Sequence, residues 1–232
     1  MKKIDNKLKY VIKGLFTILI FWFSPYFKLI PIKLFKLNIN NLSSTTSIIL
    51  SLFSTLIIVF ILFFLYRKDL ENDFKKFIKN KEENMDIGVR YWIVGLILMM
   101  AVNFILNSVF KLGGANNEQS IQKMIKILPL LMLIDAGVLS PFVEEIVFRK
   151  TLKDVFNNKW VFVILSFLFF GLAHVITSAQ VPTDYLYIIP YGILGASFAL
   201  AYEKTDTIFT SIFLHMLHNT ILVILSIITI LL

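Results

Sequence analysis

Long apolar segments are the feature that most restricts what this chain of 232 residues can fold into. Seven of them are long enough, or nearly so, to cross a bilayer core of roughly 30 Å, which takes about 20 helical residues. Only 16% of the residues are charged, against roughly 25% in soluble proteins. The sequence therefore predicts an all-α, polytopic membrane protein. We expect about seven transmembrane helices, near residues 12–30, 46–66, 91–110, 126–148, 160–178, 185–202 and 207–230.

Two features subdivide this pattern. Pro141 follows Ser140 in the fourth span, and proline removes a backbone hydrogen bond from the preceding helical turn, so we expect that span to be broken there. Residues 67–90 mix both charge signs with apolar residues, which indicates a cytoplasmic amphipathic segment at the membrane interface. We therefore divide the chain into N-terminal helices that include this segment, residues 1–110, and a transmembrane core, residues 111–232, that we expect to carry the chemistry.

The basic residues predict the orientation. With a cytoplasmic N-terminus, 17 of the 23 Lys and Arg residues lie on the cytoplasmic side, as the positive-inside rule requires. The net charge of +8 is explained by loops beside lipid headgroups, so we expect the bilayer as a partner and no nucleic acid. Abundant Lys, Ile and Asn are typical of an AT-rich bacterium. We therefore expect a multi-pass protein of a bacterial plasma membrane, with its C-terminus outside.

The stretch 140–150 places charges inside apolar surroundings, where each costs several kcal/mol. Glu145 and Arg149 are four residues apart on a helix, the spacing of a favourable ion pair. Glu144 lies about 100° away around the helix and has no such partner. The spacing therefore predicts one structural carboxylate and one that is free for chemistry.

All the histidines of the chain fall within apolar segments: His174, His215 and His218. Counted from a predicted turn at 157–159, Glu144 and His174 both lie about 20–24 Å along their helices, so an antiparallel hairpin brings them level. In the last span His215 and Asn219 are four residues apart and share one helical face. We expect Glu144, His174, His215 and Asn219 to line one water-accessible cavity in the membrane.

These groups suit the hydrolysis of a peptide bond without a protein nucleophile. A carboxylate can act as general base to a water, and imidazoles and an amide can stabilise an oxyanion or bind a metal. The chain has no cysteine and no Gly-x-Ser-x-Gly elbow, which makes covalent acyl transfer unattractive. His-Glu-x-x-His is also absent. Zinc stays open as a cofactor; if it binds, the ligands would be His174, His215 and Glu144.

Three short motifs carry a resemblance to a known family: Glu144-Glu145-x-x-x-Arg149, Phe170-x-x-x-His174 and His215-x-x-x-Asn219. In this order they resemble the CPBP family of intramembrane proteases, which includes type II CAAX prenyl endopeptidases and bacteriocin-processing, Abi-like proteins. Members are often called metalloproteases, and a metal-free glutamate mechanism is also argued for them.

The resemblance implies a role for each matching position. Glu144 would be the catalytic glutamate, and His174 would help to hold the attacking water. His215 and Asn219 would stabilise the oxyanion, while Glu145 and Arg149 would be structural. By their pattern alone, Phe170 is expected to pack in the core and His218 to support the site. The chain departs from the family at Lys150, where a glycine often follows the arginine.

The resulting prediction is an intramembrane endopeptidase that cleaves a membrane-associated peptide or small protein. Bacteriocin or pheromone processing and self-immunity are the expected contexts. One alternative is a non-catalytic immunity or scaffold protein of the same fold. Another is a proton-coupled carrier that uses Glu144 and the histidines as a relay, although the two halves show no inverted repeat.

Overall fold

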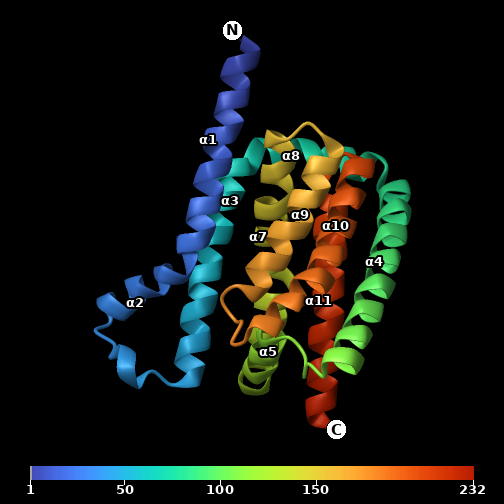
Figure 1. Ribbon diagram of the computed structural model, residues 1–232. Helices are drawn as coiled ribbons and strands as arrows, with labels where there is room; N and C mark the ends of the chain where they lie inside the picture. Colours follow the sequence, from blue (N-terminus) through green and yellow to red (C-terminus); the bar gives the residue numbers. More distant parts are fainter. Residues whose placement is uncertain (1) are drawn as a thin grey trace.

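A computed structural model describes the backbone of residues 2–232 and the side chains of residues 7–232. The described chain is 89% helical and has no strand, which confirms the predicted all-α class. Its elements run, in chain order (Figure 1), α1 (Lys2–Phe23), η1 (Ser24–Lys28), α2 (Leu29–Leu34), η2 (Ile39–Asn41), α3 (Ser44–Lys79), α4 (Lys81–Phe110), α5 (Asn116–Ile127), α6 (Pro129–Ile134), η3 (Asp135–Leu139), α7 (Ser140–Glu145), η4 (Ile146–Lys150), α8 (Thr151–Val155), α9 (Lys159–Val175), η5 (Pro182–Tyr187), α10 (Ile188–Thr205) and α11 (Ile208–Leu231).

Membrane-spanning helices make up most of the molecule. Among the described residues, five stretches are long and apolar enough to cross a bilayer: Lys7–Leu34, Ser44–Lys79, Lys81–Phe110, Pro182–Thr205 and Ile208–Leu231. The fourth and fifth predicted spans are also helical, but the helical run of the fourth begins only at Pro129, after the end of α5 at Ile127, and the fifth, α9, has only 17 residues. The predicted count of seven is therefore not confirmed, whereas the assignment as a multi-pass membrane protein is.

The amphipathic segment predicted over residues 67–90 is not a helix of its own. The helix α3 continues to Lys79 and α4 begins at Lys81, so this segment is the end of one long helix and the start of the next. Leu70 and Phe77 on its apolar side are buried, whereas Phe74 is exposed. The mixed charges therefore lie on the extension of two membrane helices and the turn between them.

One hydrophobic core joins the two parts into which the sequence divides the chain. Its largest cluster combines Ile58 and Leu62 of α3 with Val143 of α7, Phe170 of α9 and Ile212 of α11. Residues 1–110 and 111–232 therefore share a core. The chain termini lie at opposite ends of the bundle, and the connection between α8 and α9 lies at the end where the N-terminus is found (Figure 1).

Close packing of α9 against α10 positions one side of the site. A Cβ added at Gly171 would lie 2.5 Å from the carbonyl oxygen of Ile188, a backbone atom that cannot easily move. Small residues permit such approaches between membrane helices. The approach brings His174 against Tyr191, with ring centroids 4.6 Å apart.

Candidate active site

The helical run from Pro129 to Val155 carries both glutamates and contains two π-helical turns, η3 and η4. The break expected at Pro141 is absent, because Leu139 and Ser140 keep helical backbone angles. The Ser140 N–H donates to the carbonyl of Asp135, five residues back, in the wide turn just before the proline. A proline clashes with the carbonyl four residues earlier in a regular helix, and the wider turn relieves that clash. The prediction of two separate helical pieces was wrong for this reason.

The wide turn leaves two carbonyl groups for α11 to satisfy. Pro141 has no N–H to donate to the turn before it. Instead, Asn219 Nδ2 donates to the carbonyl of Ala136 at 3.0 Å, and Thr220 Oγ1 donates to that of Gly137 at 3.3 Å. Buried carbonyls need such partners, especially where lipid excludes water. These bonds fix α11 at the level of the glutamates.

Glu145 and Arg149 form the predicted ion pair at a fully buried position. Arg149 Nη1 lies 3.1 Å from Glu145 Oε1, and neither side chain has any exposed surface. The same Oε1 accepts a hydrogen bond from His215 Nδ1 at 2.8 Å, a contact that the sequence did not predict. The structural carboxylate therefore holds one of the two imidazoles of the site.

Aromatic rings and a backbone carbonyl complete the surroundings of Arg149. Its Nη2 donates to the carbonyl of Gly195 at 3.3 Å. Its guanidinium carbon lies 4.2 Å from the ring centroid of Phe170, a cation–π contact. Buried charges are tolerated only when paired in this way. Phe170, which is 1% exposed, thus packs in the core as predicted and also supports the arginine.

Glu144 faces two imidazoles without touching either. Its Oε2 lies 3.7 Å from His174 Nε2 and 3.7 Å from His215 Nε2. These distances exceed a direct hydrogen bond. The oxygen is buried and accepts no hydrogen bond from residues 7–232, although the side chain as a whole is 18% exposed. The structure therefore brings together three of the four residues that the sequence singled out.

Hydrogen bonds orient both imidazoles in the same way. His174 Nδ1 lies 2.9 Å from the carbonyl oxygen of Phe170, as His215 Nδ1 lies beside Glu145. A carbonyl and a carboxylate can only accept, so we assign the proton to Nδ1 in both rings. In the neutral ring of His174, Nε2 then turns a lone pair towards Glu144. A neutral imidazole so placed can accept a hydrogen bond from a water held between it and Glu144. His215 lies between the carboxylates of Glu144 and Glu145, and its Nε2 can carry a second proton.

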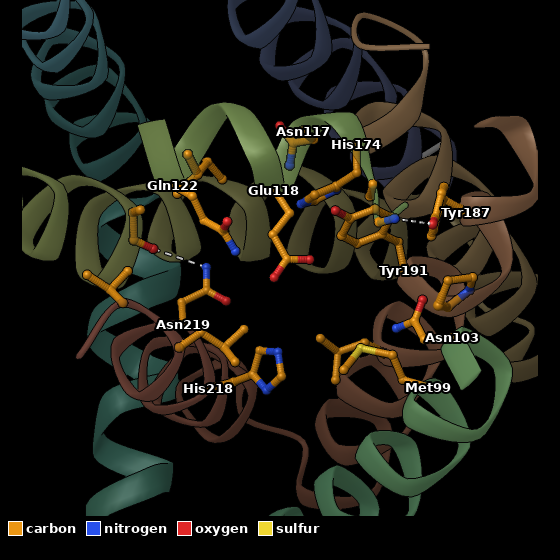
Figure 2. A pocket seen from close by; sticks show the side chains of 18 of the residues that line it. Met99, Asn103, Asn117, Glu118, Gln122, His174, Tyr187, Tyr191, His218 and Asn219 are labelled. Atoms are coloured by element: carbon orange, nitrogen blue, oxygen red, sulfur yellow. Dashed lines mark hydrogen bonds between the residues drawn. The ribbon is translucent and has the colours of Figure 1, made fainter. Parts of the chain in front are cut away.

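Two cavities meet this layer from different sides. The larger, of about 350 Å³, is lined by His174, His215 and Asn219 (Figure 2). The smaller, of about 140 Å³, is lined by Glu144 and by hydroxyl groups of Ser24, Ser51, Ser54, Thr55 and Ser140. The sequence predicted that all four residues line one cavity. The structure instead places Glu144 on the smaller cavity and the other three residues on the larger one. Glu144 lies at the junction, with the smaller cavity on one side and the two histidines on the other.

Asn219 and His218 also reach the large cavity from α11. The amide of Asn219 lies at the cavity wall, with one N–H committed to the carbonyl of Ala136 (Figure 2). His218 Nδ1 accepts a hydrogen bond from the indole of Trp92 at 3.3 Å, which leaves the proton of the neutral ring on Nε2. His218 is therefore held by α4 in a supporting position, apart from Glu144.

The described side chains do not form the zinc site that the sequence left open. Among residues 7–232, no group of three or more His, Asp and Glu side chains is arranged to hold a metal ion. Glu144, His174 and His215 are the nearest approach to such a set, through their 3.7 Å contacts. We therefore derive no step through a metal.

Several residues of this region were not predicted from the sequence. Tyr191 stacks on His174, and Phe198 stacks on His215 with ring centroids 4.9 Å apart. Trp92 orients His218, and Glu118 lines the large cavity. Aromatic residues are common in apolar spans, so their pattern gave no signal. Glu118 gave a weak signal, as an acid directly after the stretch 113–117, which is rich in Gly and Asn.

Known proteins are similar to this chain over the segment that contains the candidate site. Residues 126–221 match the family model of the type II CAAX prenyl endopeptidases, Rce1-like. The chain is 27% identical over 158 residues to YdiL of Bacillus subtilis, which is named as a candidate membrane peptidase. It is 31% identical over 141 residues to MroQ of Staphylococcus aureus, named as a membrane-embedded CAAX protease. These alignments cover 66% and 56% of the chain.

The matches confirm the resemblance to CAAX proteases that the three motifs predicted. They span 62% of the length of YdiL and 53% of that of MroQ, so the chain covers less than two thirds of either relative. No solved structure matches the chain significantly. The matched segment includes all eight residues proposed for the site or its support.

Proposed function

Because residues 126–221 resemble the type II CAAX endopeptidases, we propose that this protein is an intramembrane endopeptidase that hydrolyses peptide bonds with water activated by Glu144. The observation that carries the proposal is the position of one carboxylate oxygen. It is buried, accepts no hydrogen bond from the described side chains and lies 3.7 Å from two imidazole nitrogens. A general base acts through a hydrogen bond to the water that it deprotonates, and a water held by these three atoms satisfies that requirement.

The reaction proceeds by addition and elimination. The water oxygen bonds to the carbonyl carbon of the peptide while Glu144 takes one of its protons, and the carbonyl oxygen becomes an oxyanion. The C–N bond then breaks, the carbonyl re-forms, and Glu144 passes the proton to the departing nitrogen. His174, whose Nδ1 is tied to the backbone, accepts a hydrogen bond from the second O–H of the water and orients it.

His215 stabilises the oxyanion in its protonated form, in which Nε2–H donates to the new negative charge. Glu145 accepts from Nδ1 at 2.8 Å and compensates the charge of the imidazolium. Arg149 holds Glu145 ionised and fixed in place. Asn219 keeps one amide N–H for the same oxyanion after the other has bonded to the carbonyl of Ala136.

The substrate that suits this site is a membrane-associated peptide or small membrane protein. The cavity that leads to the histidines has a volume of about 350 Å³ and combines apolar walls with amide groups. An extended peptide needs both kinds of contact. Processing of a bacteriocin or pheromone precursor fits a protein of this class, whose relative MroQ is named as a CAAX protease. A prenyl group on the substrate is not required by the proposal.

The test is a comparison of the wild-type protein with Glu144→Gln, both reconstituted in lipid nanodiscs. Each is incubated with a synthetic library of apolar peptides, and products are identified by mass spectrometry. Cleavage by the wild type alone supports the proposal. Absence of cleavage by a correctly folded wild type refutes it in favour of the non-catalytic alternative. Proton uptake into liposomes that depends on Glu144 refutes it in favour of the carrier.

A further inference from the structure

The large cavity has polar side chains on α4 and α5 that the proposed hydrolysis does not use. Besides the histidines, its wall includes side-chain amides from α4 and α5: Asn103, Asn107, Asn117 and Gln122. Figure 2 shows Asn103, Asn117 and Gln122 around the opening, with the carboxylate of Glu118 pointing into its centre. Amides can pair with the N–H and C=O groups of an extended peptide. A carboxylate among them favours a positively charged group instead.

Glu118 is held in this position by the loop that precedes it. Asn116 Nδ2 donates to Asp184 at 2.9 Å and to the carbonyl of Ser178 at 3.2 Å. The N–H of Gly114 donates to the hydroxyl of Tyr187 at 2.9 Å. The start of α5 is thereby tied to the connection between α9 and α10. The carboxylate is therefore presented by a fixed element rather than by a free loop end.

The charges that face Glu118 leave it without a counter-ion. Among residues 7–232 it makes no ion pair, and no Lys or Arg lines the cavity. The other titratable groups on the wall are His174, His215, His218 and two tyrosines, Tyr187 and Tyr191. The carboxylate is open to the cavity, yet the surrounding protein raises the pKa of Glu118. A bound cation would stabilise the charge of this carboxylate.

We propose that Glu118 binds a cationic group of the substrate, a Lys or Arg side chain or a free amino terminus, in the large cavity that His174 and His215 also line. This assignment rests on the proposed peptidase activity and adds a selection to it. The protein would prefer apolar peptides that carry a positive charge at a fixed distance from the cleaved bond. Because the contact is made before and during the reaction, its loss changes binding more than turnover.

The experiment compares the wild type with Glu118→Gln and Glu118→Lys in nanodiscs. The matched control is Glu82→Gln, an exposed glutamate in the first turn of α4 and remote from the cavity. The probes are 20-residue apolar peptides with Lys, Arg, Glu or Gln at each position in turn. Each is made with a free and with an acetylated amino terminus, which separates the two sources of positive charge.

We expect the wild type and the control to prefer one cationic position by about 10- to 100-fold in KM, the range for a hydrogen bond to a charged group. Glu118→Gln should lose this preference with little change in kcat, and Glu118→Lys should favour Glu at the same position. Retention of the cation preference by Glu118→Gln overturns the inference, as does a wild type without any preference.

Binding separates this inference from the peptidase proposal. Fluorescently labelled versions of the same peptides are titrated against Glu144→Gln and against the Glu144→Gln/Glu118→Gln double variant. A cation-dependent Kd that is lost in the double variant supports the subsite even if no peptide is cleaved, in which case only the peptidase proposal fails. Binding that is absent or independent of the cation overturns the subsite, whatever the outcome for cleavage.

Discussion

Two adjacent carboxylates on one helix lie in opposite kinds of environment. Glu145 has no exposed surface, and its Oε1 contacts both Arg149 and His215. Glu144 is 18% exposed, lines a small cavity among hydroxyl-bearing and apolar residues, and leaves Oε2 without a hydrogen bond from the described residues. We call these the locked side and the cavity side of the site. The same residue type therefore serves two purposes, which its neighbours decide.

The difference shows how a membrane protein can keep a carboxylate reactive. A charge in lipid is costly unless it is paired, and complete pairing removes its capacity to take up a proton from water. Here the ion pair is concentrated on Glu145, whereas Glu144 has imidazoles at 3.7 Å and space on its other side. The locked side positions the groups, and the cavity side leaves room for water.

Replacing the carboxylate of the cavity side should have the largest effect on activity. For Glu144→Gln we expect peptide cleavage to fall by at least about 10²–10⁴-fold, the range for a lost general base, while the amount of folded protein is unchanged. The amide has nearly the same shape and breaks no ion pair. Cleavage rate and thermal unfolding in detergent are measured together. Activity that survives in Glu144→Gln would remove the cavity side from the mechanism.

Replacing Glu145 or Arg149, the ion pair of the locked side, should mainly lower the stability of the protein. Glu145→Gln and Arg149→Ala each leave an uncompensated buried charge, at a cost of roughly 3–5 kcal/mol in the free energy of unfolding. We expect lower membrane abundance and a lower melting temperature for both.

The combined variant Glu145→Gln/Arg149→Gln serves as the control for that pair. Its loss in the free energy of unfolding should be smaller than the sum of the losses in the single variants Glu145→Gln and Arg149→Gln, because no buried ion is left without its partner. Equal abundance of Glu144→Gln and Glu145→Gln would erase the contrast between the two sides.

Two neighbouring residues of α11 can sharpen the comparison, because both bond to the π turn before Pro141. Asn219→Ala and Thr220→Val each leave one carbonyl without its partner, so each should lose about 1–3 kcal/mol of stability. Of the two, only Asn219 lines the large cavity. We therefore expect Asn219→Ala to lose activity beyond its loss of stability, whereas Thr220→Val should follow its stability alone. Matching activity losses would make Asn219 purely structural.

The smallest effect is expected from single cysteine substitutions that test the membrane topology, that is, which end of the bundle faces the cytoplasm. The chain has no cysteine, so single cysteines introduced at Asn157 and Thr183 report alone. We expect an impermeant maleimide to label the first only from the cytoplasm and the second only from outside, with little change in stability. The opposite pattern would place the start of α5, and with it Glu118, on the cytoplasmic side.

Much of this arrangement could be predicted from local properties of the sequence. Helices in lipid satisfy their own backbone, so hydropathy located the helical segments of the bundle. The four-residue spacing predicted the ion pair of Glu145 with Arg149, since neighbours on one helix meet whatever surrounds them. Equal distances from the turn near Asn158 predicted that Glu144 and His174 lie level, because the rise of a helix is constant.

The tertiary structure alone decided how the remaining contacts are shared. Whether Pro141 breaks its helix depends on partners for the freed carbonyls, and these come from Asn219 and Thr220, some 80 residues later. The contact of His215 with Glu145 and the entry of Glu118 into the cavity likewise join separate helices. Periodicity along one helix carries no information about which side chain a neighbouring helix presents. Helices and their charges are therefore local properties of this sequence, whereas the division between a locked carboxylate and an open one arises only when the helices pack.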